Sequence, residues 1–242
     1  MSRRDYDEYE NNGRRSEHGF VAGLLGVIAS ACICIVILFS VTQLLMYPLG
    51  RTWFEHEFGK YSVLEDVRGE MSMESALNVM DDTMDYLIGK RDDLDITTTI
   101  DGQRQPFFTD REKSHMADCR VLVQKMIIVR RVAIVVAVVL LLAIKVLRRQ
   151  RAKRTIVNSY VVTSLASILG IGFLWYKANN DFDGFFTRFH EVFFDNNLYI
   201  LDPAKDNLIN LLPEGFFSDT AIAIVVLYLI VTITLLVLAK KV

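Results

Sequence analysis

The sequence is poor in proline and cysteine, the residues that mark extended linkers and disulfide frameworks. Its 242 residues include four prolines and three cysteines. Cys32 and Cys34 lie in a long apolar run and Cys119 is alone in a polar region, so the polar part of the chain holds no possible disulfide pair. With 52% hydrophobic residues, the composition also excludes a disordered or fibrous chain.

The motifs of several large enzyme classes are also missing. The sequence has no phosphate-binding glycine loop, no G-x-S-x-G nucleophile elbow and no H-E-x-x-H zinc helix. His190 and Glu191 are followed by Val-Phe-Phe rather than by a second histidine. Any catalytic site must therefore be assembled from residues that are distant in the sequence.

Long hydrophobic runs are what the sequence has most of. A hydrocarbon core of about 30 Å requires about 20 mostly apolar helical residues, and the segments that approach this length are 20–47, 126–147, 156–176 and 219–239. The first run is too long for a cleavable secretory signal, so we interpret it as a retained anchor. The sequence therefore predicts an all-α polytopic membrane protein with four transmembrane helices.

Charged residues predict the orientation of these helices. Arginines occur in the tail 1–19, and Lys and Arg are concentrated in the segment 148–155 and at the end 240–242. The positive-inside rule assigns all three to the cytoplasm. The loops 48–125 and 177–218 contain more Asp and Glu than Lys and Arg. We therefore expect both termini in the cytoplasm and both loops outside, packed as a small helical cap.

The first loop contains the pattern of two helices. Met and Leu recur at helical spacing between Ser72, placed as a cap, and Gly89, placed as a terminator. The apolar face of this helix either packs on the rest of the fold or lies on lipid. Thr109 and Glu112 have the spacing of a capping box, and no Pro or Gly follows before the end of 126–147, so one helix is expected to run into that span. The polar stretch between the two helices is expected to be extended or turn-like.

The second loop carries an aromatic helix face. Phenylalanines recur at i, i+3, i+4, i+7 and i+11 from Phe182 to Phe193. Aromatic residues favour the membrane boundary. We therefore expect this helix to lie in the headgroup region and to hold His190 close to the membrane surface.

Two arginines lie inside a predicted transmembrane helix. Arg130 and Arg131 fall within the segment 126–147, below its outer boundary. An arginine at that depth faces a polar cavity or a partner, or extends toward the headgroups. We therefore count both among the residues that could support a site.

His115 and His190 are the candidates for proton transfer. Imidazole titrates near neutral pH, so two histidines facing one site can serve as general base and general acid in acyl transfer. Asp118 is near the first in the sequence, and Glu191 and Asp195 are near the second. Zinc binding and purely structural hydrogen bonding are alternative uses of the same residues. The residues alone leave these three interpretations open.

Several motifs resemble those of one bacterial membrane protein family. They are Pro-Phe-Phe at 106–108, Glu112 with His-Met-Ala-Asp at 115–118, His-Glu-Val-Phe-Phe-Asp-Asn-Asn-Leu at 190–198, and Leu-Asp-Pro at 201–203. With the four-span layout, they are similar to the family of the lipoprotein intramolecular transacylase Lit. The resemblance covers nearly the whole chain.

The resemblance implies a reaction and its catalytic residues. Family members move the sn-2 acyl chain of a lipoprotein's diacylglyceryl group onto the α-amine of the same lipidated cysteine, which gives the lyso form without a cofactor or an outside acyl donor. By the resemblance, His115 and His190 are the catalytic residues. Orienting carboxylates and donors for an oxyanion would come from the supporting residues Asp118, Glu191, Asp195, Asn196, Asn197, Arg130 and Arg131.

The resemblance also implies partners and a location. The partners are diacylated bacterial lipoproteins and membrane phospholipid, with no nucleic acid and no metal. The location is the bacterial cytoplasmic membrane, with the site at the outer leaflet. Two alternatives stand beside this reading. One is a non-catalytic envelope membrane protein that binds a partner, and the other is a zinc-dependent lipid or peptide hydrolase.

Overall fold

The chain folds into two compact units in a computed structural model. The structure describes the backbone of residues 3–67 and 69–241, and the side chains of residues 19–67 and 69–241. The arginines of the predicted tail 1–19 therefore lie outside the described side chains. We call residues 1–38, 129–172 and 227–242 the bundle unit, and residues 39–128 and 173–226 the loop unit.

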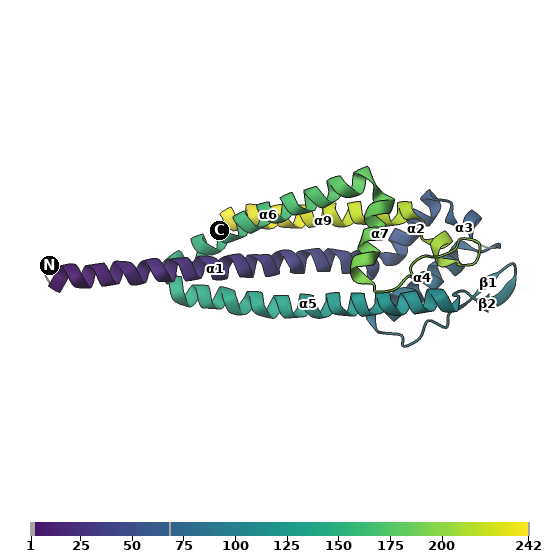
Figure 1. Cartoon of the computed structure of the whole chain (residues 1–242), viewed down its shortest axis with the longest axis horizontal. Coiled ribbons are helices and arrows are strands. Elements are labelled where there is room, and N and C mark those ends of the chain that lie inside the picture. Colours follow the sequence, from purple (N-terminus) through teal and green to yellow (C-terminus); the bar gives the residue numbers. More distant parts are fainter. Residues whose placement is uncertain (1–2, 68, 242) are drawn as a thin grey trace. The chain divides into compact units, whose positions relative to one another are not determined.

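The bundle unit consists of parts of four long helices (Figure 1), namely α1 (Arg3–Met46), α5 (Asp110–Arg148), α6 (Ala152–Asn180) and α9 (Glu214–Lys241). The Ser159 hydroxyl on α6 donates to the Gly23 carbonyl on α1 over 3.5 Å. A Cβ atom on Gly26 would lie 2.3 Å from the Ser159 Oγ, so this approach of α1 to α6 requires glycine. Further along α6, the Ser167 and Tyr228 hydroxyls are 2.7 Å apart and link α6 to α9.

These helices are long and apolar enough to cross a membrane. By length and composition, the described residues contain three such helical segments: Gly19–Met46, Asp110–Asn180 and Glu214–Lys241. The middle segment includes α5, the short 3-10 turn η1 (Arg149–Arg151) and α6, and therefore both predicted spans 126–147 and 156–176. The predicted all-α membrane fold is confirmed, and the number of four crossings stays a prediction.

The loop unit has its own hydrophobic core. It includes the end of α1, the first turns of α5, the end of α6 and the start of α9. Its own elements are α2 (Gly50–Lys60), α3 (Val63–Asp66), α4 (Met73–Ile88), β1 (Thr97–Ile100), β2 (Gln103–Pro106), α7 (Phe182–Phe193) and α8 (Leu208–Leu211). Phe58 from α2, Met80 from α4 and Leu211 from α8 are all buried in one cluster. Segments from both predicted loops therefore fold into a single body.

A β-hairpin occupies the polar stretch between the two predicted helices of the first loop. β1 and β2 pair antiparallel, with Thr97 opposite Pro106. The turn residues Asp101 and Gly102 both have positive φ, 54° and 72°, as a two-residue Asp-Gly hairpin turn requires. The expected extended or turn-like conformation is confirmed, and the pairing of the strands adds to it.

The two helix starts predicted in the first loop are confirmed. At α4, the Ser72 hydroxyl accepts from the Ser75 amide over 3.1 Å, and Gly89 ends the helix with φ of 85°. The apolar face of α4 is buried in the core of the loop unit, so the packed interpretation of this face is correct. At α5, the Thr109 amide donates to Glu112 Oε2 (2.6 Å) and the Glu112 amide donates to Thr109 Oγ1 (3.2 Å), which completes the capping box. From there α5 continues without a break for 39 residues.

Candidate active site

The buried carboxylate of Glu112 joins the start of α5 to the segment that follows α7. Its side chain accepts from the Leu208 amide over 2.6 Å as well as from the Thr109 amide. The Thr109 hydroxyl donates to Asp206 (2.8 Å), which also accepts from the Asp202 amide (2.8 Å). Burial raises the pKa of Glu112, against the hydrogen bonds that it accepts. These bonds hold the second loop against the first turn of α5.

His115 lies on α5, three residues after this carboxylate, and is buried. Its Nε2 is 3.6 Å from the Sγ of Cys119, one helical turn further along. Its Nδ1 is buried and has no hydrogen-bond partner among the described residues. Because buried polar atoms are nearly always paired, this nitrogen is a position where a partner from outside the described residues is expected.

His190 lies in the last turn of α7 and is also buried. Its Nδ1 is 2.7 Å from the Phe186 carbonyl oxygen. Because a carbonyl oxygen can only accept, the proton of the neutral ring is on Nδ1. The Nε2 of His190 is therefore an unprotonated nitrogen, available to accept a proton.

The two histidine rings lie together in an aromatic enclosure. Their centroids are 5.8 Å apart, with 38° between the ring planes. Phe194 packs edge-on against His115, with centroids 5.3 Å apart. Tyr199 stacks on His190 at 4.6 Å, and Phe186 packs edge-on against His190 at 4.5 Å. The fold therefore brings together one histidine from each predicted loop.

The enclosure keeps both rings neutral. Burial, followed by the neighbouring His190, lowers the pKa of His115 to about 4. Asp118 opposes this lowering and Arg111 adds to it. Burial also lowers the pKa of His190, against its hydrogen bond to a backbone carbonyl. Burial, followed by the charge of Asp118, raises the pKa of the Cys119 thiol to about 12. At neutral pH the site holds two neutral imidazoles and a protonated thiol.

Polar contacts fasten the segment after α7 to α5. The Asn196 side-chain amide donates to Asp118 Oδ2 over 2.9 Å. Arg111 Nε donates to the Ile200 carbonyl over 3.0 Å, and its Nη2 donates to the Asn197 carbonyl. Asp118 and Arg111 are on the helix that carries the first histidine. The same contacts therefore hold the segment that carries the enclosing tyrosine.

The predicted carboxylates have different positions around the pair. Asp118 is linked to His115 through its charge, while its hydrogen bond goes to Asn196. Glu191 and Asp195 are exposed and form no hydrogen bond or ion pair with the described residues. Orientation of His190 comes from a backbone carbonyl rather than from a carboxylate.

The two arginines predicted to lie deep in the membrane belong to the other unit. Arg130 is half-buried and Arg131 is exposed in the bundle unit. The supporting roles predicted for them stay predictions.

Sequence reasoning missed several residues that surround the pair. Arg111, His115 and Cys119 recur every four residues on one face of α5, so helical spacing from the capping box onward contained this signal. Phe194 and Tyr199 follow the last turn of α7. Helical periodicity carries no information on how that segment turns back over the ring of His190.

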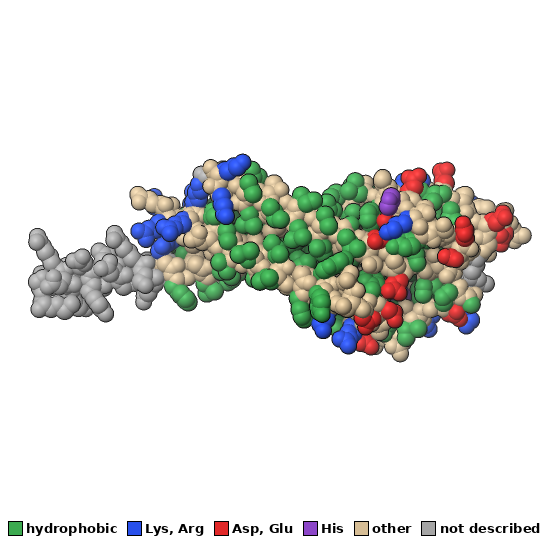
Figure 2. Space-filling view, turned by 90° about the horizontal axis from the view of Figure 1, so that it is seen from above, with side chains coloured by type: hydrophobic (Ala, Val, Ile, Leu, Met, Phe, Trp, Pro, Cys, Tyr) green, Lys and Arg blue, Asp and Glu red, His purple; other side chains and the backbone are tan. Residues whose placement is uncertain are grey.

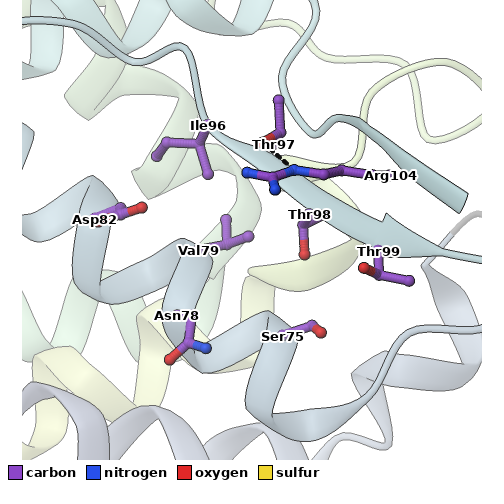
Figure 3. Close-up of a pocket in the computed structure, with 9 residues that line it drawn as sticks. All are labelled: Ser75, Asn78, Val79, Asp82, Ile96, Thr97, Thr98, Thr99 and Arg104. Carbon is purple, nitrogen blue, oxygen red and sulfur yellow. Dashed lines mark hydrogen bonds between the residues drawn. The ribbon is translucent and has the colours of Figure 1, made fainter.

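A polar recess lies elsewhere in the loop unit, between α4 and the hairpin (Figure 3). Its volume is about 220 Å³. Arg104 from β2 lies across Thr97 and donates to its hydroxyl over 3.1 Å. Asp82 at its edge is paired with Arg91 over 3.3 Å. The recess has no histidine or cysteine among its lining residues, which are Ser75, Asn78, Val79, Asp82, Ile96, Thr97, Thr98, Thr99 and Arg104. The histidine pair is therefore the better candidate for proton transfer.

The described residues around the two histidines do not provide a set of metal ligands. Within the described part of the chain, no group of three or more His, Cys, Asp or Glu side chains is placed to hold a metal ion. The third contact of the pair is aromatic rather than carboxylate. The arrangement is suited to moving protons between two positions of a bound molecule.

Comparisons with known proteins identify the family and the fold of the chain. The model of the family "Lipoprotein intramolecular transacylase Lit" matches residues 27–217. An in meso structure of the membrane integral transacylase Lit from Bacillus cereus has a TM-score of 0.68 at 20% sequence identity, and the match covers 92% of this chain and 97% of that chain. No curated protein matches the sequence.

Two further structures are of variants of the same Bacillus cereus protein, each with one histidine replaced. The arginine variant has a TM-score of 0.64 at 20% identity, covering 99% of this chain and 97% of its own. The alanine variant has a TM-score of 0.68 at 21% identity, covering 92% of this chain and 94% of its own. The structures show a shared fold, and the family model spans most of the sequence. The chain therefore belongs to the family of the lipoprotein intramolecular transacylase Lit.

Proposed function

We propose that this Lit family transacylase, which forms lyso-form lipoproteins, carries out its proton transfers with His115 and His190. The acyl chain moved is the sn-2 chain of the diacylglyceryl group, and its acceptor is the α-amine of the same lipidated cysteine. The observation that carries the proposal is the pair of buried, neutral imidazoles with centroids 5.8 Å apart.

His190 is the base in this proposal. The α-amine is largely protonated at neutral pH and must lose a proton before its nitrogen attacks the ester carbonyl. The Phe186 carbonyl holds the proton of the neutral His190 ring on Nδ1, so Nε2 accepts the proton from the amine. The lowered pKa of His190 keeps Nε2 unprotonated until the substrate arrives.

His115 is the acid. As the new C–N bond forms and the ester C–O bond breaks, the glycerol oxygen must gain a proton. The Cys119 Sγ lies 3.6 Å from the His115 Nε2. In this proposal the protonated thiol is the donor of that contact, so the proton of the neutral His115 ring is on Nδ1. That Nδ1 is buried and has no partner among the described residues. In the proposal it donates to the glycerol oxygen once the bound substrate has opened the enclosure.

The ammonium loses two protons in one turnover. The first passes through His190 to solvent before the attack, and the second passes to His190 as the C–N bond forms and is matched by the proton that His115 gives to the glycerol oxygen. The second proton then moves from His190 to His115, which restores both neutral rings.

The remaining supporting residues have separate tasks. Asn196 is engaged by Asp118, so this pair positions the segment after α7. The Asn197 side chain forms no hydrogen bond with the described residues and is the available amide donor for the oxyanion. The exposed carboxylates of Glu191 and Asp195 attract the protonated amine. Arg130 and Arg131 stay candidates for contacts with the lipid part of the substrate.

The aromatic enclosure of the two histidine rings is suited to an intramolecular reaction. Both reacting groups belong to one lipidated cysteine, so the protein has mainly to fold the substrate back on itself and to exclude water. Phe186, Phe194 and Tyr199 line the rings with apolar surface. Polar groups in such a surrounding act more strongly on developing charge than they do in water.

The proposed topology follows from the charges. The chain crosses the bacterial cytoplasmic membrane four times, with both termini and the segment 148–155 in the cytoplasm. The loops 48–125 and 177–218 then lie outside, and the histidine pair meets the diacylated lipoprotein at the outer leaflet. The acid-rich composition of both loops supports this orientation.

Tandem mass spectrometry of a synthetic diacylglyceryl lipopeptide, incubated with purified protein in liposomes, tests the proposal. Intact mass is unchanged by the transfer, so fragments must show whether an acyl chain is on nitrogen. We expect N-acyl, monoacylglyceryl peptide from the wild type, and a rate at least about 100-fold lower from His115→Ala and His190→Ala. His56→Ala, which replaces an exposed histidine of the same unit, is the matched control and keeps the wild-type rate.

Folding of each variant is checked by its unfolding midpoint in SDS. Folded His115→Ala and His190→Ala proteins with the rate of the His56→Ala control would show that the pair is structural. In that case a non-catalytic function or another catalytic centre would replace the proposal.

A further inference from the structure

An apolar groove lies in the bundle unit where α5 turns through η1 into α6. Its volume is about 600 Å³. Most of its lining is aliphatic, and its cationic residues are Lys145 on α5, Arg149 in η1 and Lys153 on α6. The full lining is Val138, Leu141, Leu142, Lys145, Arg149, Ala152, Lys153, Ile156 and Val157. The groove therefore has a long apolar floor and a cluster of positive charge.

The three cations of the groove have no anionic partner among the described side chains of their own unit. The described side chains of the bundle unit, at 19–38, 129–172 and 227–241, include no Asp or Glu. Lys145, Arg149 and Lys153 are exposed and form no ion pair or hydrogen bond through their side chains with the described residues. Lys and Arg side chains gather at the end of this unit in Figure 2. Among the described residues, these three charges are therefore available to bind an external anion.

The backbone at the groove is also unusual. Arg149 has φ of 25°, in the left-handed region that side chains other than glycine rarely adopt. This conformation places a cationic residue, rather than a glycine, at the turn between α5 and α6. Glycine would adopt this backbone conformation more easily, and the turn beside the groove nevertheless has the cationic Arg149 there.

We propose that this groove binds an anionic glycerophospholipid, with its phosphate among Lys145, Arg149 and Lys153 and an acyl chain along the aliphatic wall. Basic pockets between transmembrane helices are suited to anionic headgroups, and each cation near a phosphate strengthens binding. The aliphatic lining favours a lipid over free phosphate, because free phosphate gains nothing from apolar surface. This site is separate from the histidine pair and from its substrate.

Native mass spectrometry of the full chain in detergent tests whether the cationic residues of the groove bind the lipid phosphate. The protein is titrated with phosphatidylglycerol and with phosphatidylcholine of identical acyl chains. We expect preferential binding of phosphatidylglycerol, which the variant Lys145→Gln/Arg149→Gln/Lys153→Gln weakens about tenfold or more. A matched control, Arg154→Gln/Lys240→Gln/Lys241→Gln, also removes three positive charges but none from the groove, and changes binding less than about threefold. Equal losses in the two triple variants would mean that general surface charge attracts the lipid, and would overturn the proposal.

A second variant tests the acyl chain without changing any charge. Leu142 is exposed in the groove, so Leu142→Trp narrows it at little expected risk to folding. We expect this variant to bind phosphatidylglycerol several-fold more weakly than the wild type. We also expect that inorganic phosphate, at the same concentration as the lipid, does not displace phosphatidylglycerol from the wild type. Unchanged lipid binding, or full displacement by inorganic phosphate, would contradict a seated lipid. Retained transacylation of the lipopeptide shows that each variant is folded.

Discussion

The bundle unit and the loop unit are stabilised by different interactions. The bundle unit exposes aliphatic side chains such as Leu169 (74% exposed) and has no carboxylate among its described side chains. The loop unit buries a shared core and carries surface ion pairs such as Lys113 with Asp95 and Arg91 with Asp82. The bundle unit has the surface of a protein that is solvated by lipid, and the loop unit has that of a water-facing domain.

The difference agrees with the place proposed for the chemistry. Proton transfer requires imidazoles that are held in place and shielded, and the loop unit provides an apolar enclosure fixed by hydrogen bonds to backbone groups. The bundle unit provides small residues and hydroxyl groups that allow close helix packing. A site that uses water-exposed polar substrate groups is therefore expected in the loop unit.

The largest expected effect comes from making the same substitution, leucine to alanine, once in each unit. Leu211 in the loop unit is fully buried (0% exposed), and its replacement by Ala leaves a cavity that should cost about 2 to 5 kcal/mol of unfolding free energy. Leu169→Ala in the bundle unit removes a largely exposed side chain and should cost less than about 1 kcal/mol. SDS unfolding of both variants measures the difference. Equal losses would show that the bundle helices pack around Leu169 in an assembly.

A second prediction uses pH. The pKa of His115 is lowered from 6.5 to about 4, so its contribution to stability is complete above about pH 6.5 and is lost as the pH falls toward 4. The loss should reach roughly 3 kcal/mol, because one pKa unit corresponds to about 1.4 kcal/mol. The measurement is SDS unfolding at pH 7 and pH 4.5 of the wild type and of His115→Phe.

The phenylalanine variant is the control for all other titrating groups. It cannot take up a proton at position 115, so its stability should fall less than that of the wild type over the same range. Identical pH dependence in the two proteins would show that His115 is not held neutral by burial.

The smallest expected effect concerns the cysteines. Cys119→Val removes the thiol beside His115 Nε2 and should lower the transacylation rate several-fold, because a thiol is a weak donor. Stability should change by less than about 1.5 kcal/mol, since the volume is nearly kept. Cys32→Val in the bundle unit is the control and should leave the rate unchanged. Lipopeptide kinetics measure both, and equal rates in the two variants would remove the thiol from the proposed mechanism.

Local features of the sequence were predicted well. The cap at Ser72, the stop at Gly89 and the box of Thr109 with Glu112 are interactions between residues three or four positions apart, so spacing alone defines them. The long apolar helices follow from composition in the same way. These features could be predicted because they depend on few neighbours.

Tertiary features could be predicted only in part. The strand pairing depends on the positive φ of both Asp101 and Gly102, and a polar threonine-rich stretch also fits a plain loop. The meeting of His115 with His190 depends on how the segment after α7 is fastened by Arg111 and Asp118. These bonds join residues far apart in the sequence, where periodicity gives no information.

The proposed mechanism requires that no acyl chain leaves the substrate molecule. The half-buried thiol of Cys119 beside the pair stays protonated because its pKa is raised to about 12, so it is a poor nucleophile for an acyl carrier. In the proposed mechanism, the amine and the ester of one lipidated cysteine therefore react directly between His115 and His190.

A crossover experiment tests this claim most directly. Two lipopeptides, one with heavy peptide and deuterated acyl chains and one unlabelled, are mixed with the purified protein, and the products are sequenced by tandem mass spectrometry. The account predicts N-acylated products that are wholly labelled or wholly unlabelled. Products that combine a heavy peptide with an unlabelled N-acyl chain would contradict it, because the acyl chain would have passed through the protein or between substrates.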